Sequence, residues 1–524
     1  MVGTLLALGF EPYGWAYLVP VGVAGLTLLL HGCTPGRGAL VGSVSGTVFM
    51  LVLLPWLQVI GPDAWVALSL LEGLFYGVLG AATVVVLRVR WWPLWVAMLW
   101  VATELLRSSV PFGGFPWGRL SFASADTPAS ALFGYVGAAG TTFAIALLGS
   151  ALAWALRHVR RTPTQAFAAL GGAVVLAVSG TIATPWAPGP TEEPGRIVTV
   201  AAVQGNVPGE GMDAFAERRA VLENHVEATH DLAAAVEAGE QPRPDIVIWP
   251  ENSTDIDPFA DATVHADIQG AVDAIGVPVL VGAMVSGSEP SDVFNQGIVW
   301  EPGVGPGQRY SKTHPVPFGE YIPMRDLLAR WITRLDQIPR DMVPGSDPGA
   351  LDMAGTVVGD VICFEVAYDG LVHDVVERGA DLVVVQTNNA TYMGTGQVEQ
   401  QFAISRLRAI ETNRHVVVAA TNGVSGVIAP DGSVVERAPV RERAVLTEDI
   451  PVFGSTTPAL HLARPLELAL SGGVLVPVML GLGLNYRRRG RTTEDDLVPA
   501  GSRTETTGSR KETTGSRREA AGER

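Results

Sequence analysis

Gly359-Asp360-Val361-Ile362-Cys363-Phe364-Glu365 reads GDVICFE, a strand-like run that leads into a cysteine. A helix-like run over residues 370–378 comes next. A cysteine at a strand-to-turn junction can expose its sulfur at the lip of a sheet, where tight backbone geometry suits a nucleophile. Taken alone, Cys363 is better explained as a small buried hydrophobic residue, because that is the usual state of a free cysteine. The rest of the chain decides between the two interpretations.

Around this stretch, from Ile197 onward, strands alternate with amphipathic helices. Strands are predicted at 197–207, 245–252, 278–285, 295–300, 380–390 and 415–422, and helices at 213–238 and 397–413. Residues 427–435 turn through Pro430-Asp431-Gly432, which is a hairpin signal. Continuous Val and Ile strands between helices indicate a sheet that is buried on both faces. The segment 195–455 is therefore predicted to be a layered α/β domain.

The chain before this domain is a series of apolar segments. With 48% hydrophobic and 17% charged residues, the 524-residue chain is too apolar and too long for one compact soluble domain. Most segments approach the ~20 residues that span a bilayer. Spans are predicted at 15–31, 40–60, 65–87, 92–106, 130–156, 165–186 and 468–484. A further short apolar run at 2–10 is too short to span alone, so the N-terminal membrane domain (1–188) is predicted to have six or seven spans. A C-terminal membrane helix is predicted at 466–485.

Arginines orient these spans. They cluster in alternate loops, which are predicted to be cytoplasmic: Arg37, Arg88, Arg90, Arg157, Arg160, Arg161, Arg487, Arg488, Arg489 and Arg491. The α/β domain then lies outside the cytoplasm, so Cys363 and Cys33 are on opposite sides and cannot pair. The tail at 486–524 repeats TTGSR and has no core residues, so it is predicted to be disordered and cytoplasmic.

Charge and cysteine content exclude several functions. The net charge of −16 argues against a nucleic-acid partner, which would favour a basic face. The two cysteines form no disulfide framework, and no Cys/His cluster has the spacing of a zinc site. Neither a metal nor a cofactor is predicted.

Two polar features stand out within the membrane domain. Glu72 and Glu104 lie in apolar runs, where a carboxylate is costly and indicates function unless it is paired, as Glu104 could be with Arg107 one turn on. The loop at 111–124 (PFGGFPWGRLSFAS) interleaves aromatic residues and glycines. It is either part of a substrate portal at the lipid surface or an interfacial aromatic belt.

Three chemically useful residues lie near predicted strand ends. Glu251 ends DIVIWPEN, Lys312 lies in YSKTHPVPFGEYIP, and Cys363 ends the strand of GDVICFE. Ends of parallel strands in one sheet meet at one edge, so we expect the three side chains to come together from a single sheet. Each residue alone has a structural explanation, but the three together favour a catalytic site.

The motifs WPEN, YSKTHPVPFGEYIP, GDVICFE and QTNNATY resemble the Glu-Lys-Cys signature of the nitrilase superfamily. With spans before the domain and one after it, residues 1–485 resemble the bacterial apolipoprotein N-acyltransferase family. One departure is Thr391, where family members often carry tryptophan. The resemblance implies an α + α/β fold, in which a polytopic helical domain carries an αββα sandwich outside the membrane.

The resemblance also implies roles for the site residues. Glu251 would be the general base, Cys363 the nucleophile, and Lys312 the group that stabilises the oxyanion. Glu320 would orient Lys312 or assist proton transfer, and Glu365 would shape the pocket beside the nucleophile. Candidate substrate-binding residues are Trp117, Phe318, Phe364, Asn388 and Thr391.

The substrates that the resemblance implies are membrane lipids. An acyl chain would pass from a phospholipid donor, through a thioester on Cys363, to the α-amino group of a diacylglyceryl-modified apolipoprotein, with ping-pong kinetics. Two alternatives stay open. One is a membrane-anchored amidase or carbon–nitrogen hydrolase that uses water, and the other is a non-catalytic partner of a polyprenol-phosphate mannosyltransferase.

Overall fold

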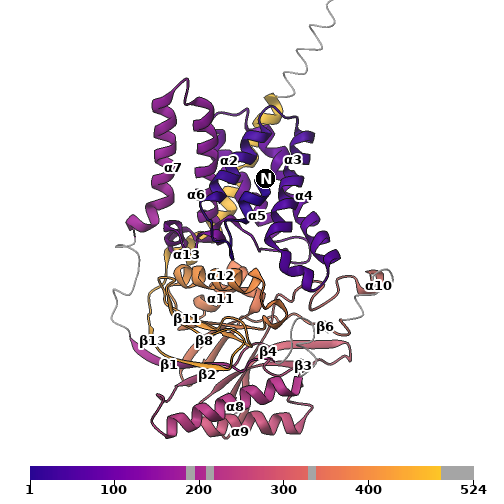
Figure 1. Ribbon diagram of the computed structural model, residues 1–524, viewed down its shortest axis with the longest axis vertical. Helices are drawn as coiled ribbons and strands as arrows, with labels where there is room; N and C mark the ends of the chain where they lie inside the picture. Colours follow the sequence, from indigo (N-terminus) through magenta and orange to yellow (C-terminus); the bar gives the residue numbers. More distant parts are fainter. Residues whose placement is uncertain (184–194, 208–217, 329–337, 485–524) are drawn as a thin grey trace, which may run out of the picture.

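The computed structural model describes residues 1–183, 195–207, 218–328 and 338–484. A helical bundle stands above a layered α/β domain (Figure 1). This arrangement confirms the predicted fold class, in which a domain of apolar helices carries a layered α/β sandwich. The boundary predicted at residue 188, the first residues of the helix predicted at 213–238 and the tail at 486–524 lie outside the described residues.

The bundle has a helix at each predicted apolar segment. These helices are α1 (Val2–Ala7), α2 (Leu18–Leu30), α3 (Pro35–Leu53), α4 (Pro62–Val86), α5 (Trp92–Arg107), α6 (Phe133–His158), α7 (Pro163–Ala183) and α13 (Pro458–Gly473), with 3-10 turns η1 (Pro55–Val59), η2 (Leu120–Ser124) and η3 (Pro128–Leu132). Among the described residues, the four helices at 35–53, 62–86, 128–158 and 458–484 are long and apolar enough to cross a membrane. The chain is therefore a multi-pass membrane protein.

Helices α3 and α4 pack closely because glycines line their contact. A Cβ at Gly42 would lie 2.1 Å from the carbonyl oxygen of Tyr76, and one at Gly80 would lie 2.2 Å from that of Gly38. Small residues at such a spacing let two helix backbones touch, which stabilises helix pairs in lipid, where burial of apolar surface contributes little. Any larger side chain at these two positions would push the helices apart.

The α/β domain contains two sheets. Its strands are β1 (Arg196–Gln204), β2 (Ile246–Ile248), β3 (Val279–Ser286), β4 (Asp292–Glu301), β5 (Gly305–Ser311), β6 (Asp341–Met342), β7 (Ala350–Met353), β8 (Thr356–Ile362), β9 (Leu382–Thr387), β10 (Val416–Ala420), β11 (Gly426–Ile428), β12 (Val434–Arg437) and β13 (Ala444–Val452). One sheet has the order β13-β1-β2-β3-β4-β5, with β6 beside β4, and the other has the order β12-β11-β10-β9-β8-β7. The predicted hairpin at 430–432 joins β11 and β12, which pair antiparallel.

Helices cover both outer faces of the sandwich. The remaining elements are α8 (Arg218–Glu237), α9 (Ala262–Ile275), α10 (Arg325–Leu328), α11 (Asp369–Glu377) and α12 (Gly396–Thr412), with 3-10 turns η7 (Cys363–Ala367) and η8 (Ala390–Tyr392). Residues of α8 and α9 pack on the first sheet, and α11 and α12 lie between the second sheet and the bundle (Figure 1). Val200, Ile248, Val384 and Val417 share the core between the two sheets.

Gln400 on α12 joins the domain to the bundle. Its Oε1 accepts hydrogen bonds from the indoles of Trp56 (3.2 Å) and Trp117 (2.8 Å). Its Nε2 donates to the carbonyl oxygens of Glu11 (2.8 Å) and Leu53 (3.1 Å). All the hydrogen-bonding capacity of one buried amide is thus satisfied by the bundle, which fixes α12 against it.

Candidate active site

Lys312 lies between two carboxylates at the centre of the site. Its Nζ donates to Oε1 of Glu251 at 3.0 Å and to Oε1 of Glu320 at 2.6 Å. Lys312 is only 1% exposed, and burial alone would lower its pKa. The two carboxylates outweigh that effect and raise the pKa well above the usual value, so Lys312 is a cation at neutral pH.

Glu251 follows β2, and its carboxylate is held by three residues that lie in or directly after β4, β5 and β9. Asn295 of β4 donates its amide to Oε1 at 2.7 Å, and the backbone N–H of Asn388, after β9, donates to Oε2 at 2.8 Å. Together with Lys312, which follows β5, these contacts fix both oxygens of the carboxylate. A charge-assisted bond is roughly twice as strong as a neutral one, so the carboxylate has a single orientation.

Cys363 begins η7 directly after β8, and its φ angle is +57°. Residues other than glycine rarely adopt this left-handed conformation. It costs roughly 1–3 kcal/mol, and residues strained in this way occur mainly at functional sites. The sharp turn predicted from GDVICFE is therefore present. The expectation of a single sheet was wrong: β2 and β5 belong to one sheet and β8 to the other, so the site lies across the sandwich.

The thiol of Cys363 is partly buried beside Glu251 and Lys312. Burial is the main cause that raises the pKa of this thiol, and the Glu251 carboxylate raises it further. Lys312 has the opposite effect, and the pKa is raised to about 12. At neutral pH only about 10⁻⁵ of such a thiol is ionised. Nucleophilic attack by this sulfur therefore requires a base that removes the proton as the bond forms.

Glu365 is a fully buried carboxylate that ties the cysteine turn to the lysine segment. It accepts bonds from the backbone N–H groups of Ile362 (2.9 Å), Thr313 (2.7 Å) and His314 (2.9 Å). The hydroxyl of Tyr310 donates to its two oxygens at 3.0 and 2.9 Å. Glu365 thus spans the segments on either side of the site and sets their separation.

We expect Glu365→Ala to lower the stability of the protein by about 3 kcal/mol or more. Several buried donors would lose a charged acceptor, and each such loss costs about 1–3 kcal/mol. The measurement is the thermal midpoint of the purified protein in detergent. The matched control is Glu399→Ala, whose ion pair with Arg437 is exposed and contributes little. Equal midpoints for the two variants would contradict the structural role of Glu365.

The loop at 111–124 packs directly on the nucleophile turn. The Phe364 ring is stacked on Phe115 at 5.6 Å and on Trp117 at 5.4 Å. Trp117 is 1% exposed, so it lies inside the junction of the two parts and not at the surface. Phe318 and Phe112 are 41% and 43% exposed and meet edge to face at 6.2 Å, which makes them the accessible aromatic pair of this region.

We expect Trp117→Ala to destabilise the fold by about 3–5 kcal/mol, the usual cost of removing a buried Trp side chain. The change would also leave Gln400 without one of its donors. Phe112→Ala in the same loop is the control and should lower the thermal midpoint far less, because its ring is accessible. A Trp117→Ala protein as stable as Phe112→Ala would show that the stacked junction carries little energy.

Two other candidate residues lie in the segment after β9. Asn388 binds Glu251 through its backbone, and its side-chain oxygen accepts a bond from the Thr421 hydroxyl at 3.0 Å, so its observed contacts are positioning contacts. Thr391 is 7% exposed in η8, and the next residue, Tyr392, packs edge to face on Trp56 at 5.3 Å. The segment therefore links the site to the bundle.

Sequence reasoning missed Asn295 and Tyr310. Both are buried side chains on strands, Asn295 in β4 and Tyr310 in β5. Tyr310 precedes Lys312 by two positions, so the side chains of Tyr310 and Lys312 are expected on the same side of an extended chain. This two-residue spacing from Lys312 is the feature of the sequence that could have identified Tyr310 as a site residue.

The buried carboxylates of the membrane domain hold the loop at 111–124. Arg107 pairs with Glu72 at 3.2 Å and donates to the carbonyl oxygens of Phe115 and Trp117 at 2.9 and 2.7 Å. Glu104 accepts from the backbone N–H of Leu120 at 2.8 Å. The pairing of Glu104 with Arg107, which the sequence allows, is not the one observed, because Arg107 bonds to α4 instead.

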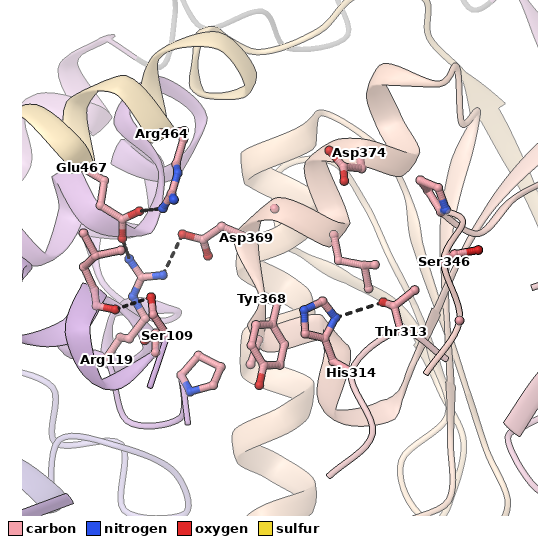
Figure 2. A pocket seen from close by; sticks show the side chains of 18 of the residues that line it. Ser109, Arg119, Thr313, His314, Ser346, Tyr368, Asp369, Asp374, Arg464 and Glu467 are labelled. Carbon is pink, nitrogen blue, oxygen red and sulfur yellow. Dashed lines mark hydrogen bonds and ion pairs between the residues drawn. The ribbon is translucent and has the colours of Figure 1, made fainter. Parts of the chain in front are cut away.

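A cavity of about 400 Å³ lies between the bundle and the α/β domain. Figure 2 shows Ser109, Arg119, Arg464 and Glu467 on one wall, and His314, Tyr368, Asp369 and Asp374 on the other. The Tyr368 ring is stacked on His314 at 4.2 Å. Among the described residues, no group of three or more His, Cys, Asp or Glu side chains is placed to hold a metal ion.

Comparisons with known proteins agree with this architecture. Residues 199–455 match the carbon–nitrogen hydrolase family, and residues 2–151 match the N-terminal domain of apolipoprotein N-acyltransferase. An amidase of the nitrilase superfamily from Nesterenkonia AN1 aligns with 51% of this chain and 95% of its own, at 18% identity and a TM-score of 0.38. The family match over residues 199–455 defines the class, a carbon–nitrogen hydrolase domain joined to a domain of apolar helices.

Full-length relatives identify the family. An apolipoprotein N-acyltransferase from Mycolicibacterium smegmatis is 40% identical over 87% of this chain and 80% of its own length. One from Methylococcus capsulatus is 30% identical over 93% of this chain and 95% of its own. The chain belongs to the apolipoprotein N-acyltransferase family, and its activity is that of an acyltransferase.

Proposed function

We propose that the protein transfers an acyl chain from a phospholipid, through a thioester on Cys363, to the α-amino group of a diacylglyceryl-modified apolipoprotein. The observation that carries this proposal is the group at the site: a cationic Lys312 held between Glu251 and Glu320, beside a cysteine on a strained turn. The relatives named above are N-acyltransferases, so neither the hydrolase nor the mannosyltransferase partner is favoured.

In the first half-reaction, Glu251 takes the thiol proton while the sulfur of Cys363 attacks the ester carbonyl of the phospholipid. An S–C bond forms, the carbonyl oxygen gains negative charge, and Lys312 stabilises that charge. The C–O bond then breaks, and the lysophospholipid leaves as an alcohol with the proton from Glu251. A thioester remains on the enzyme.

In the second half-reaction, the amine of the apolipoprotein attacks the thioester. Glu251 accepts the amine proton and returns a proton to the departing sulfur, which regenerates the thiol and yields an amide. Glu320, which is bonded to Lys312, keeps the ammonium aimed at the carbonyl oxygen. The lysophospholipid leaves before the amine attacks the acyl-enzyme, so the kinetics are ping-pong.

The test is mass spectrometry of the purified protein, intact and after proteolysis, following incubation with a phospholipid. The expected result is an added acyl mass on the peptide that contains Cys363, removed by hydroxylamine and transferred to a diacylglyceryl lipopeptide. Release of free fatty acid with no lipopeptide product would support the hydrolase alternative. Complete absence of an adduct would overturn the thioester route.

We propose further that the chain is divided as its sequence suggests: membrane helices at 1–188 and 466–485, the catalytic domain at 195–455 outside the cytoplasm, and a cytoplasmic tail at 486–524. The arginines in alternate loops support this orientation.

This orientation predicts the behaviour of reporter fusions. Alkaline phosphatase inserted at the exposed turn around Gly303 should be active, and the same reporter placed after Arg161 should be inactive, since it folds only outside the cytoplasm. A fluorescent protein at the two positions is the reciprocal control. The opposite pattern would reverse the proposed sidedness.

A further inference from the structure

Arg119 joins three separate parts of the chain. It lies in the loop between α5 and α6 and is 3% exposed. Its guanidinium pairs with Asp369 at 2.7 Å, with Glu467 of α13 at 3.3 Å and with Glu104 of α5 at 3.6 Å. Figure 2 shows Arg119 between Glu467 on the bundle side and Asp369 on the α/β side.

Asp369 is the connection from Arg119 to the nucleophile turn. Its second oxygen pairs with Arg408 of α12 at 2.7 Å. Arg408 also donates to the carbonyl oxygens of Val366 and Ala367 at 2.8 and 3.0 Å, which end the turn that Cys363 begins. Burial raises the pKa of Asp369, but the two guanidinium groups outweigh burial and hold it below its usual range, so the carboxylate is ionised.

The turn thus has two independent sets of anchors. Glu365 holds its start to Thr313 and His314 within the α/β domain, next to Lys312. Contacts to the bundle come from the loop at 111–124 instead: Trp117 stacks on Phe364, and Arg119 pairs with Asp369. The first set fixes the cysteine relative to the other catalytic groups, and the second fixes it relative to the membrane domain.

We propose that Arg119 is a positioning residue that holds the nucleophile turn in register with the membrane domain, so that a lipid in the bilayer reaches Cys363. This inference rests on the proposed function, in which Cys363 is the nucleophile and the donor comes from the bilayer. On this proposal a small soluble ester does not have to be delivered from the bilayer, so we expect its reaction to depend mainly on the anchors within the α/β domain.

Two conservative substitutions test this positioning role. Arg119→Lys keeps the charge, but its single ammonium cannot reproduce the planar fork that reaches three carboxylates. Asp369→Asn is nearly isosteric and breaks the link at its other end, while Arg119 keeps Glu104 and Glu467. The control is Arg464→Gln, because Arg464 also pairs with Glu467 but its side chain is 63% exposed.

The experiment measures thioester formation on Cys363 in the full-length protein in lipid nanodiscs. The two acyl donors are a radiolabelled palmitoyl phospholipid in the bilayer and the soluble ester p-nitrophenyl butyrate. Arg119→Lys and Asp369→Asn should slow the phospholipid reaction by at least about tenfold, since misplacement of a reacting group by about 1 Å costs up to a hundredfold. Their reaction with the soluble ester should stay within about threefold of the wild-type rate, and Arg464→Gln should match the wild type with both donors.

A parallel loss with both donors would overturn the proposal, because Arg119 would then support the catalytic geometry or the fold as a whole. Unchanged rates with both donors would overturn it as well. Thermal midpoints measured on the same samples show how much of each variant is folded, and the rates are expressed per folded protein. Failure of the proposed function is distinguishable on the wild-type protein, which would then form no thioester with the phospholipid, or would release the acyl group as free fatty acid and give no acylated lipopeptide.

Discussion

Replacing Cys363 by alanine is expected to abolish both the acyl-enzyme and the acylated lipopeptide. The chain has two cysteines, and Cys363 is the one that follows β8 on a left-handed turn, while Cys33 lies in the helical bundle. The measurement is incubation with labelled phospholipid, followed by gel detection of protein-bound label that hydroxylamine removes. Because Cys363 is partly buried and not packed deep in the core, the variant should fold as the wild type does.

Two controls separate the chemistry from other effects. Cys363→Ser keeps a hydroxyl that is a far poorer nucleophile, and we expect little or no turnover. Cys33→Ala removes the other free cysteine, which is distant in the bundle, and should keep full activity. A Cys363→Ala protein that still carried label and still acylated a lipopeptide would refute the mechanism.

Glu251→Gln should slow thioester formation by about 10²–10⁴, the usual contribution of a general base. The effect is expected to be large here because burial, the main cause that raises the pKa of the Cys363 thiol, remains in the variant and leaves little thiolate at pH 7. Glutamine keeps the shape of the side chain, and its oxygen can still accept from Asn295, so the comparison reports on the proton and not on a cavity. The measurement is the single-turnover rate of acyl-label incorporation.

The pH dependence provides a second measurement on the same variant. Without the base, attack depends on the thiolate alone, and its fraction rises about tenfold for each pH unit below the thiol pKa. The rate for Glu251→Gln should therefore increase steeply between pH 7 and pH 9, and the wild-type rate should increase much less. A variant with the wild-type rate and a flat profile would remove Glu251 from the base role.

Burial changes how the lysine must be tested. From its strand-end position, Lys312 could occupy an open polar site, where truncation to alanine would leave the fold unaffected. In the structure it is 1% exposed and forms ion pairs with two carboxylates. Lys312→Ala would leave those charges buried and unpaired, which typically costs 3–5 kcal/mol, so a loss of activity would combine unfolding with loss of oxyanion stabilisation.

The sequence by itself determined the class of the molecule and singled out Glu251, Lys312 and Cys363 as its candidate catalytic residues. Apolar runs near the length of a bilayer gave the helical bundle, and continuous Val and Ile strands between helices gave the layered domain. The motifs around Glu251, Lys312 and Cys363 marked the positions that meet in space. These signals are local: each depends on periodicity or composition within one short segment, so they survive without tertiary information.

Only the tertiary structure decided how these parts fit together. It assigned Cys363 to a different sheet from Glu251 and Lys312, and it gave Arg107 to Glu72 and Arg119 to Asp369. Arg119 and Asp369 are 250 residues apart, and no local pattern links residues at that distance. Which arginine reaches which carboxylate depends on how helices and sheets pack, because a buried charge takes the partner that packing brings near and not the one closest in sequence.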